Sequence, residues 1–257
     1  MAFSTRLAGK SAIITGAASA IGIGFATARR LAQEGARVLL ADIDGAGVSA
    51  AAGILRDAGF DAEAAALDVT SEPQWNAVLA AAAARFSGLD ILVNNAGMAL
   101  LRPLTDTDAS AYDNLMAVNM RGVFLGTRGA VAIMRAHGNG GAIVNVSSVA
   151  GIVGANCMSV YAAAKGAIRM FSKSVALEAA AAGIRCNSVH PGMVDTNFFH
   201  ATAATFPEAA AAIKSVIPMQ RLAKADEIAP MIAFLASDDA SYVTGAEFVV
   251  DGGYAAG

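Results

Sequence analysis

Several residue types are scarce in this 257-residue chain, and each shortage excludes a class of protein. Charged residues make up 15 % and the net charge is −3, without a basic block or tail, so nucleic acid is not an expected partner. Two cysteines, Cys157 and Cys186, are too few for a disulfide framework and predict a reducing, cytoplasmic location. The three histidines, His137, His190 and His200, lack metal-ligand spacing, so no metal is expected.

A clean membrane-spanning run is missing as well. The longest uncharged stretch, 139–164, has the length of a span but is interrupted throughout by Gly, Asn and Ser. A buried strand followed by a loop is the better interpretation, and no membrane partner is expected. What the chain has in abundance is hydrophobic residues, 56 % of the total, which fits a parallel sheet covered by helices on both faces.

The N-terminal part of the chain has the pattern of a β-α-β unit with glycines at its first turn, Gly16, Gly22 and Gly24. The unit is a strand at 11–15, a helix at 25–33 and a strand at 37–41. Glycine lets the backbone approach a pyrophosphate, and the helix N-terminus offers free N–H groups. Asp42, at the end of the second strand, can accept hydrogen bonds from ribose hydroxyls and would repel a 2′-phosphate. Since neither Arg nor Lys follows at Ile43, the sequence predicts NAD rather than NADP.

The alternation of strands and helices continues through the chain. Further strands are expected at 62–67, 89–93, 142–146, 184–189 and 247–250, and helices at 44–58, 72–86, 109–136, 226–236 and from about Tyr161 to 182. The pattern predicts an α/β fold, a doubly wound parallel sheet of the Rossmann type, in a single domain over residues 1–257. The segment 197–218 breaks the rhythm and is expected to be a short substrate lid.

Tyr161 and Lys165 form a candidate reaction centre. They stand four apart in helix-forming sequence, which places the phenol and the ammonium on one helix face. A cation beside a tyrosine favours the phenolate, so a lowered pKa is expected, with proton exchange at about pH 7–9. Ser147 and Ser148 follow the strand at 142–146, at the sheet edge where such folds bind ligands.

Together these motifs resemble the short-chain dehydrogenase/reductase family, in its compact, NAD-preferring branch, over nearly the whole chain. The residues that carry the resemblance are Thr15-Gly16, Gly22-Ile23-Gly24, Asp68-Val69, Asn94-Asn95-Ala96-Gly97, Asn119, Ser148, Tyr161, Lys165, Pro191-Gly192, Thr196 and Val250-Asp251-Gly252-Gly253. The family's spacing of 13 between serine and tyrosine selects Ser148 rather than Ser147 as the catalytic serine.

The resemblance implies a role for each residue. Tyr161 is the general acid/base, and Ser148 hydrogen-bonds the substrate oxygen. Lys165 lowers the pKa of the tyrosine and holds the nicotinamide ribose, while Asn119 anchors a water that relays protons. The implied cofactor-binding residues are Gly16, Gly22, Ile23, Asp42, Asp68, Val69, Asn95, Ala96, Gly97, Tyr161, Lys165, Pro191, Gly192, Val194 and Thr196.

The glycine turn departs from the family pattern. Five residues separate Gly16 from Gly22, where the family has three before its Gly-Ile-Gly. Either Ala20 replaces the middle glycine or the loop is two residues longer. The second alignment is preferred because it keeps the helix from Phe25 in the family's register.

The expected substrate walls are mostly apolar. They comprise Met98–Leu101, 152–158, Met193 and the lid, with Phe198, Phe199 and Phe206. We therefore expect an NAD-dependent oxidoreductase that interconverts a small hydrophobic secondary alcohol and its ketone, as a homotetramer by family resemblance. Alternatives are a 3-oxoacyl thioester reductase acting on an acyl-carrier protein or CoA, and a catalytically silent NAD-binding scaffold. The first alternative usually uses NADPH and a basic docking patch.

Overall fold

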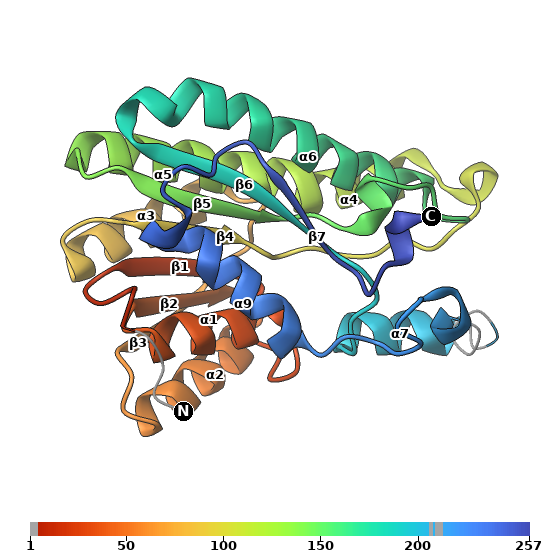
Figure 1. The fold of residues 1–257 in the computed structure, drawn as a ribbon, viewed down its shortest axis with the longest axis horizontal. Coiled ribbons are helices and arrows are strands. Elements are labelled where there is room, and N and C mark those ends of the chain that lie inside the picture. The colour runs from red at the N-terminus through yellow and green to blue at the C-terminus, as the bar shows by residue number, and fades with distance from the viewer. Residues whose placement is uncertain (1–4, 206–207, 209–212) are drawn as a thin grey trace.

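The computed structural model describes residues 5–205, 208 and 213–257, which fold into three layers with a parallel sheet in the middle (Figure 1). The strands are β1 (Ser11–Thr15), β2 (Arg37–Asp42), β3 (Ala62–Ala66), β4 (Ile91–Asn94), β5 (Gly141–Val146), β6 (Ile184–Pro191) and β7 (Glu247–Val250). Their order across the sheet is β3-β2-β1-β4-β5-β6-β7, and every neighbouring pair is parallel. The predicted fold class is confirmed.

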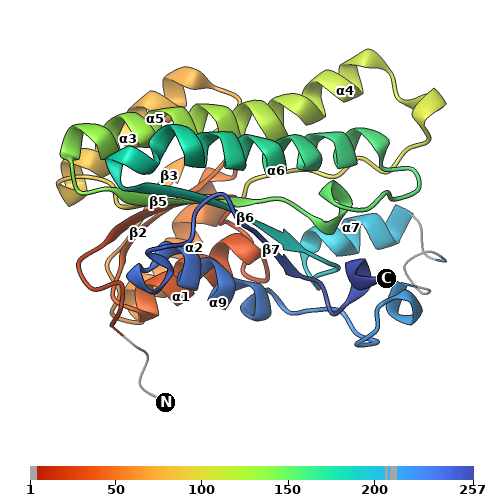
Figure 2. The same ribbon diagram turned by 45° about the horizontal axis from the view of Figure 1, so that its top comes forward.

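Helices cover both faces of the sheet, as Figure 2 shows. One face carries α1 (Ile23–Gln33), α2 (Gly45–Asp57) and α9 (Ala225–Ala236), and the other carries α3 (Glu72–Phe86), α4 (Ala109–Met116), α5 (Gly122–His137) and α6 (Ser159–Ala179). Each face has its own hydrophobic core, the first around Phe25, Leu40 and Ile228 and the second around Trp75, Leu92 and Ile143. The inner strands β1, β2 and β4 are mostly apolar because both of their faces are buried.

Local signals explain where several elements begin. The side chain of Ser71 accepts a hydrogen bond from the N–H of Gln74 and caps α3. Asp44 caps α2 in the same way through the N–H of Gly47. Gly138, in the left-handed conformation with φ 78°, ends α5.

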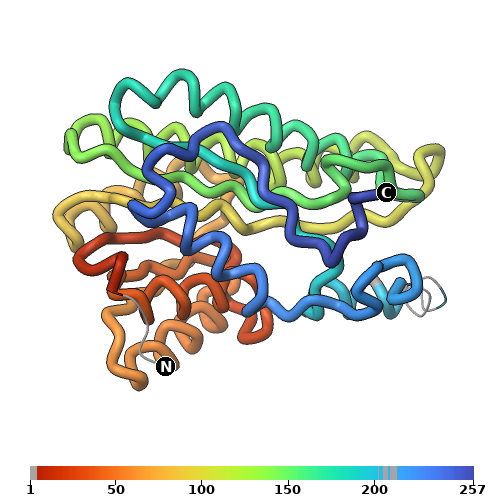
Figure 3. Tube along the Cα trace, viewed as in Figure 1, coloured from red at the N-terminus to blue at the C-terminus, as the bar shows by residue number. Residues whose placement is uncertain are grey.

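Two segments differ from the sequence expectation. The helix expected over 109–136 is interrupted by a π-helical turn, Ala117–Arg121, between α4 and α5. The expected lid contains a helix, α7 (Asn197–Thr205), and a short 3₁₀ turn, Ile213–Val216; the predicted wall residue Phe206 lies outside the described residues. The trace in Figure 3 ends at the same end of the sheet as α7, after a last 3₁₀ turn, Tyr254–Ala256. Within the described residues, no helix is both long and apolar enough to cross a membrane.

Candidate active site

A cavity of about 810 Å³ lies beyond the carboxyl ends of the strands. The strand order reverses between β1 and β4, which is where open parallel sheets bind ligands. All the predicted cofactor residues line this cavity, together with Ser148. Asn119 is buried and does not line it. The structure therefore brings together residues from six strand ends that are far apart in the sequence.

The glycine turn has the geometry of the longer loop. Helix α1 begins at Ile23, and Gly22 caps it without a side-chain hydrogen bond, so its first N–H groups have no side-chain partner at this cap. A Cβ on Gly24 would overlap with the carbonyl oxygen of Gly16, so only glycine permits this close packing of helix on strand. Ala20 lies in a turn before the helix. These contacts favour Gly22 and Gly24, rather than Ala20, as the second and third glycines.

Asp42 ties the glycine turn to the next loop. Its carboxylate accepts hydrogen bonds from the N–H of Ala18 at 3.0 Å and the N–H of Asp44 at 3.1 Å. The side chain is thereby held at the cavity wall with further acceptor capacity on both oxygens. Ile43, which is 75 % exposed, lines the cavity beside it. Among the described lining residues the charged side chains are Asp42, Asp68 and Lys165.

Asp68 and Val69 form the neighbouring wall, after β3. The carboxylate of Asp68 accepts from both the N–H and the hydroxyl of Thr70, which fixes its orientation. Val69 is 8 % exposed, and a Cβ on Gly122 would lie 2.8 Å from its Cγ2. This glycine allows α5 to pack closely against the wall.

The end of β4 is locked to the end of β1 by side chains. The hydroxyl of Thr15 accepts hydrogen bonds from the N–H groups of Asn95 and Ala96, both at 3.0 Å. The amide of Asn95 donates to the carbonyl oxygens of Thr15 and Gly16 at 2.9 and 3.0 Å. Asn95 therefore lines the cavity while its amide group holds the glycine turn in place.

Ser148, Tyr161 and Lys165 converge at the end of β5. The phenol of Tyr161 is hydrogen-bonded to Ser148, and the Ser148 hydroxyl also accepts from the N–H of Ala150 at 3.2 Å. The Nζ of Lys165 donates to the carbonyl oxygen of Val146 at 2.9 Å and lies 5.7 Å from the centroid of the Tyr161 ring. Both α6 side chains are almost fully buried, at 6 and 5 % exposure.

The expected lowering of the tyrosine pKa is not found in this geometry. Burial raises the pKa of Tyr161 to about 12, and the hydrogen bond from Ser148 opposes this shift only in part. Burial also lowers the pKa of Lys165 to about 8. The four-residue spacing is a correct guide to proximity. It failed as a guide to pKa because burial of the phenol is the main cause of the shift in the tyrosine pKa, while the ammonium faces the ring and donates to the Val146 carbonyl.

Asn119 explains the π-helical turn. Its amide oxygen accepts from the N–H of Met98 at 2.8 Å, and its amide nitrogen donates to the Met98 carbonyl at 2.9 Å. A Cβ on Gly97 would lie 3.2 Å from the Oδ1 of Asn119 and 3.6 Å from the Nζ of Lys165. Gly97 thus keeps the space between the amide and the ammonium free of side-chain atoms. π-Helical turns of this kind are frequent at functional sites.

The end of β6 completes the cofactor side of the cavity. Gly192 passes so close to the tail that a Cβ there would lie 2.8 Å from the Cα of Asp251. Val194 pairs with Ala223 in an isolated bridge. The hydroxyl of Thr196 donates to the Val194 carbonyl at 3.3 Å and caps the start of α7.

Two neighbouring polar residues have structural roles. The hydroxyl of Ser147 donates to the carbonyl of Lys165 at 2.8 Å, which joins β5 to α6. His190 is fully buried, with Nδ1 3.1 Å from the carbonyl oxygen of Ser148 and Nε2 2.9 Å from the hydroxyl of Ser188. Burial is the main cause that lowers the pKa of His190. The described residues contain no group of three His, Cys, Asp or Glu side chains placed to hold a metal.

The remaining walls are mostly apolar. Those from the predicted substrate segments are Met98, Leu101, Val153, Gly154, Ala155, Asn156, Met158, Met193, Asn197, Phe198, Phe199 and Ile213. The ring of Phe198, on α7, lies 6.0 Å from the ring of Tyr161, between centroids. Cys157, in the same loop as Met158, does not line the cavity.

Among the lining residues that sequence reasoning missed are Ser19, Ile43 and Tyr254. Ser19 belongs to the lengthened glycine loop, and Ile43 directly follows Asp42. Tyr254 follows β7, and its position could have been predicted, because the carboxyl ends of parallel strands all lie at the same edge of the sheet. The C-terminal segment should therefore have been expected at this edge like the other strand ends.

Comparisons with known proteins agree with the fold and show the family. The family model described as enoyl-(acyl carrier protein) reductase matches residues 16–255. Cyclopentanol dehydrogenase of Comamonas sp. is 41 % identical over 251 residues, which cover 98 % of this chain and 99 % of the relative. Cis-4-hydroxycyclohexanecarboxylate dehydrogenase of Sinomonas cyclohexanicum is 45 % identical over 246 residues, which cover 95 % and 96 %.

Solved structures give the same result. The crystal structure of a short-chain type dehydrogenase/reductase from Mycobacterium marinum superposes with a TM-score of 0.92, at 31 % identity, over 97 % of each chain. The sequence match covers nearly the whole chain, and the fold match does too. The chain belongs to the short-chain dehydrogenase/reductase family, a family of oxidoreductases that bind a nicotinamide dinucleotide.

Proposed function

We propose that this protein is an NAD-dependent dehydrogenase that interconverts a hydrophobic, cyclic secondary alcohol and its ketone. The observation that carries the proposal is the convergence of Ser148, Tyr161 and Lys165 on an apolar-walled cavity next to the glycine turn. Two relatives support the cyclic class, since their names specify a cyclopentanol and a hydroxycyclohexane carboxylate.

The preference for NAD rests on the charges around the cavity. Asp42 places a fixed carboxylate at the end of β2, and Ile43 beside it carries no charge that could hold a 2′-phosphate. The free N–H groups at the start of α1 suit a pyrophosphate. Lys165 and Thr196 would hold the nicotinamide end. When bound, the nicotinamide accepts or supplies the hydride.

Tyr161 and the residues around it carry out the proton transfer. Ser148 donates a hydrogen bond to the substrate oxygen and stabilises the negative charge that develops on it. Tyr161 exchanges the proton with that oxygen as general acid/base. Asn119 and Lys165 border the space beside Gly97 where a water can pass the proton on to solvent. The pKa of Tyr161 is far from neutral. These groups therefore contribute to proton transfer through their placement around the substrate oxygen.

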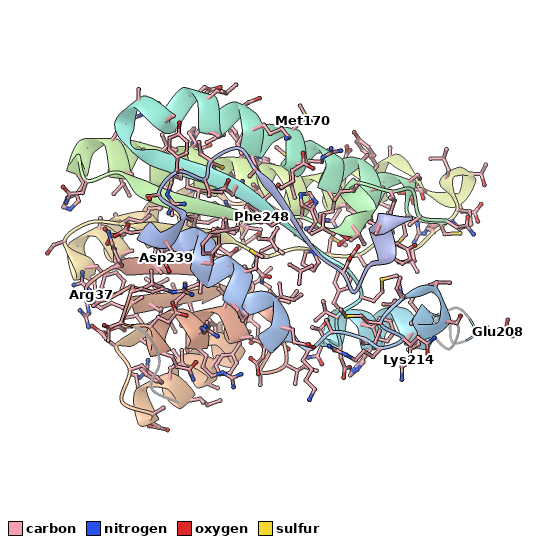
Figure 4. All side chains as sticks on the ribbon, viewed as in Figure 1. Arg37, Met170, Glu208, Lys214, Asp239 and Phe248 are labelled. Atoms are coloured by element: carbon pink, nitrogen blue, oxygen red, sulfur yellow. The ribbon has the colours of Figure 1, made fainter. Side chains whose placement is uncertain are left out.

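We also propose a homotetramer in a reducing cytoplasm. Phe124 on α5 is 40 % exposed, and Met170 and Leu177 on α6 are 57 and 86 % exposed. Met170 projects from the side of α6 that faces away from the sheet (Figure 4). Apolar side chains exposed along two neighbouring helices are typical of a surface buried by a second copy. Both cysteines are free thiols, as a reducing compartment would keep them.

Reduction of a 3-oxoacyl thioester is the competing activity, and the description of the matching family model, an enoyl-(acyl carrier protein) reductase, shares with it only the acyl-thioester class of substrate. The test is cofactor turnover with cyclopentanol, cyclohexanol and their ketones beside acetoacetyl-CoA, each with the NAD and the NADP pair. The proposal predicts turnover of the cyclic compounds and a preference for the NAD pair. Turnover of the thioester alone, or a preference for NADPH, would reject it. Light scattering that finds a monomer would reject the tetramer.

A further inference from the structure

Tyr254 gives the substrate side of the cavity a polar group that the family motifs do not include. It lies in the 3₁₀ turn Tyr254–Ala256, four residues after the end of β7, and lines the same cavity as Ser148 and Tyr161. Figures 1 and 2 place this C-terminal turn at the same end of the sheet as α7. The hydroxyl of Tyr254 has no hydrogen-bond partner among the described residues, so it can bond a ligand.

The tail that carries Tyr254 is held rigidly. The carboxylate of Asp251 accepts hydrogen bonds from the N–H groups of Gly253 and Ala255, at 2.8 and 2.7 Å. Gly252 and Gly253 both have positive φ, 67 and 90°, which turns the chain sharply after β7. A Cβ on Gly253 would lie 3.2 Å from the Cγ of Pro218, at the end of the lid. The backbone that carries the tyrosine is therefore held against the lid.

The wall around the Tyr254 hydroxyl is mostly apolar, so this single hydroxyl can affect which substrates bind. The lining residues on the substrate side are Met98, Leu101, Val149, Ala150, Val153, Gly154, Ala155, Asn156, Met158, Met193, Asn197, Phe198, Phe199, Ile213 and Tyr254. Among them the hydrogen-bonding side chains are Asn156 and Asn197, which are exposed, and Tyr254, which is half-buried; the amide of Asn197 donates to the hydroxyl of Ser19. An apolar wall with a few placed polar groups takes an apolar ligand and reads its polar substituents.

We propose that Tyr254 is a specificity-determining residue whose hydroxyl hydrogen-bonds a second polar substituent on the substrate ring. The substrate class is then a ring alcohol that carries another hydroxyl, oxo or carboxylate group, rather than a plain cycloalkanol. This inference rests on the proposed function, since it names the substrate of the same site. It differs from the proton-transfer roles because Tyr254 need not touch the reacting oxygen.

The experiment compares cyclohexanol with cyclohexane-1,4-diol, using NAD and the full-length protein. The wild type is expected to have a lower KM for the diol. Tyr254→Phe should raise the KM of the diol about threefold to tenfold, with kcat and the cyclohexanol KM within about twofold of wild type, because a neutral hydrogen bond contributes that much. Tyr242→Phe, at a fully exposed tyrosine away from the cavity, is the matched control and should change neither KM.

Each outcome of this experiment either supports or overturns the role of Tyr254. A Tyr254→Phe effect that is equal for both substrates, or absent, overturns the inference and leaves the dehydrogenase assignment intact. The same holds if Asn156→Ala, and not Tyr254→Phe, raises the KM of the diol. Failure of the wild type to oxidise any ring alcohol rejects the proposed function and the inference with it. Thermal melts of all variants show whether folding is preserved.

Discussion

The two halves of the cavity are built by different means. The cofactor half is made of strand ends, and its residues are locked by close backbone contacts, such as those of Gly16 and Gly24, and by the hydrogen bonds that Asn95 donates to Thr15. The substrate half is made of loops, α7 and the C-terminal turn. The rigid cofactor half fixes the position of the reaction. The substrate half, which is made of loops that can vary in sequence, determines which substrate binds.

Tyr161 stands at the border of the two halves, and its substitution should have the largest effect. Tyr161→Phe removes the acid/base and keeps the ring that packs near Phe198. We expect kcat to fall by about 10² to 10⁴, with NADH affinity within about twofold, measured by steady-state kinetics and by fluorescence titration. Tyr112→Phe, at an exposed tyrosine of α4, is the control. Near-normal turnover would remove Tyr161 from the mechanism.

Cofactor selectivity tests the rigid half alone. Asp42→Ala combined with Ile43→Arg removes the carboxylate and supplies a partner for a 2′-phosphate. The ratio of kcat/KM for NADP over NAD should rise by about tenfold to a hundredfold, the size of a hydrogen bond to a charged group. Asp44→Ala removes the neighbouring α2 cap and should leave the ratio unchanged. An unchanged ratio in the double variant would show that Asp42 does not select the cofactor.

The pH dependence of turnover tests the buried phenol. With a pKa raised to about 12 by burial, Tyr161 holds its proton at neutral pH. Alcohol oxidation needs the deprotonated form, so its rate should rise by up to about tenfold per pH unit from about pH 7 to 9. Ketone reduction should not rise, because the phenol is already protonated. An oxidation rate that is level above about pH 7 would show a lowered pKa, as the sequence spacing suggested.

Gly24→Ala tests whether the glycine turn depends on close packing. The added methyl overlaps with the Gly16 carbonyl, so we expect about 1–3 kcal/mol less unfolding free energy and weaker NADH binding. Gly53→Ala is the matched control, since it is also helical but its Cβ would meet only the Arg56 guanidinium at 3.8 Å. That variant should gain about 0.5–1 kcal/mol through helix propensity. Urea unfolding measures both, and equal effects would contradict the packing argument.

These comparisons also explain what the sequence could predict. Glycines, Asp42 and the serine, tyrosine and lysine set are tied to strand ends or to one helix face, so spacing alone places them. The raised pKa of Tyr161 was not predictable, because it depends on burial by distant elements. Ser19 was missed for a related reason, because its place in the cavity depends on loop packing that no local pattern encodes. Tyr254 could have been expected at this edge because it follows β7, but its position against the lid depends on packing such as the contact between Gly253 and Pro218.

A hydrogen bond joins the lid directly to the glycine loop. The amide of Asn197, the first residue of α7, donates to the hydroxyl of Ser19 in the glycine loop at 3.1 Å. Through this contact an occupied cofactor site can position the lid. Removing the hydrogen bond is expected to have the smallest effect of the series because both side chains are exposed.

Asn197→Ala should raise the KM of the alcohol about twofold to fivefold and change kcat little, as expected for the loss of one neutral hydrogen bond. Ser19→Ala should have the same effect, and the double variant should add nothing to it, because each single change already breaks the bond. Additive effects would mean that the two side chains act separately. The halves would then be neighbours without coupling, and the lid would be positioned by Phe198 and the other apolar contacts of α7 alone.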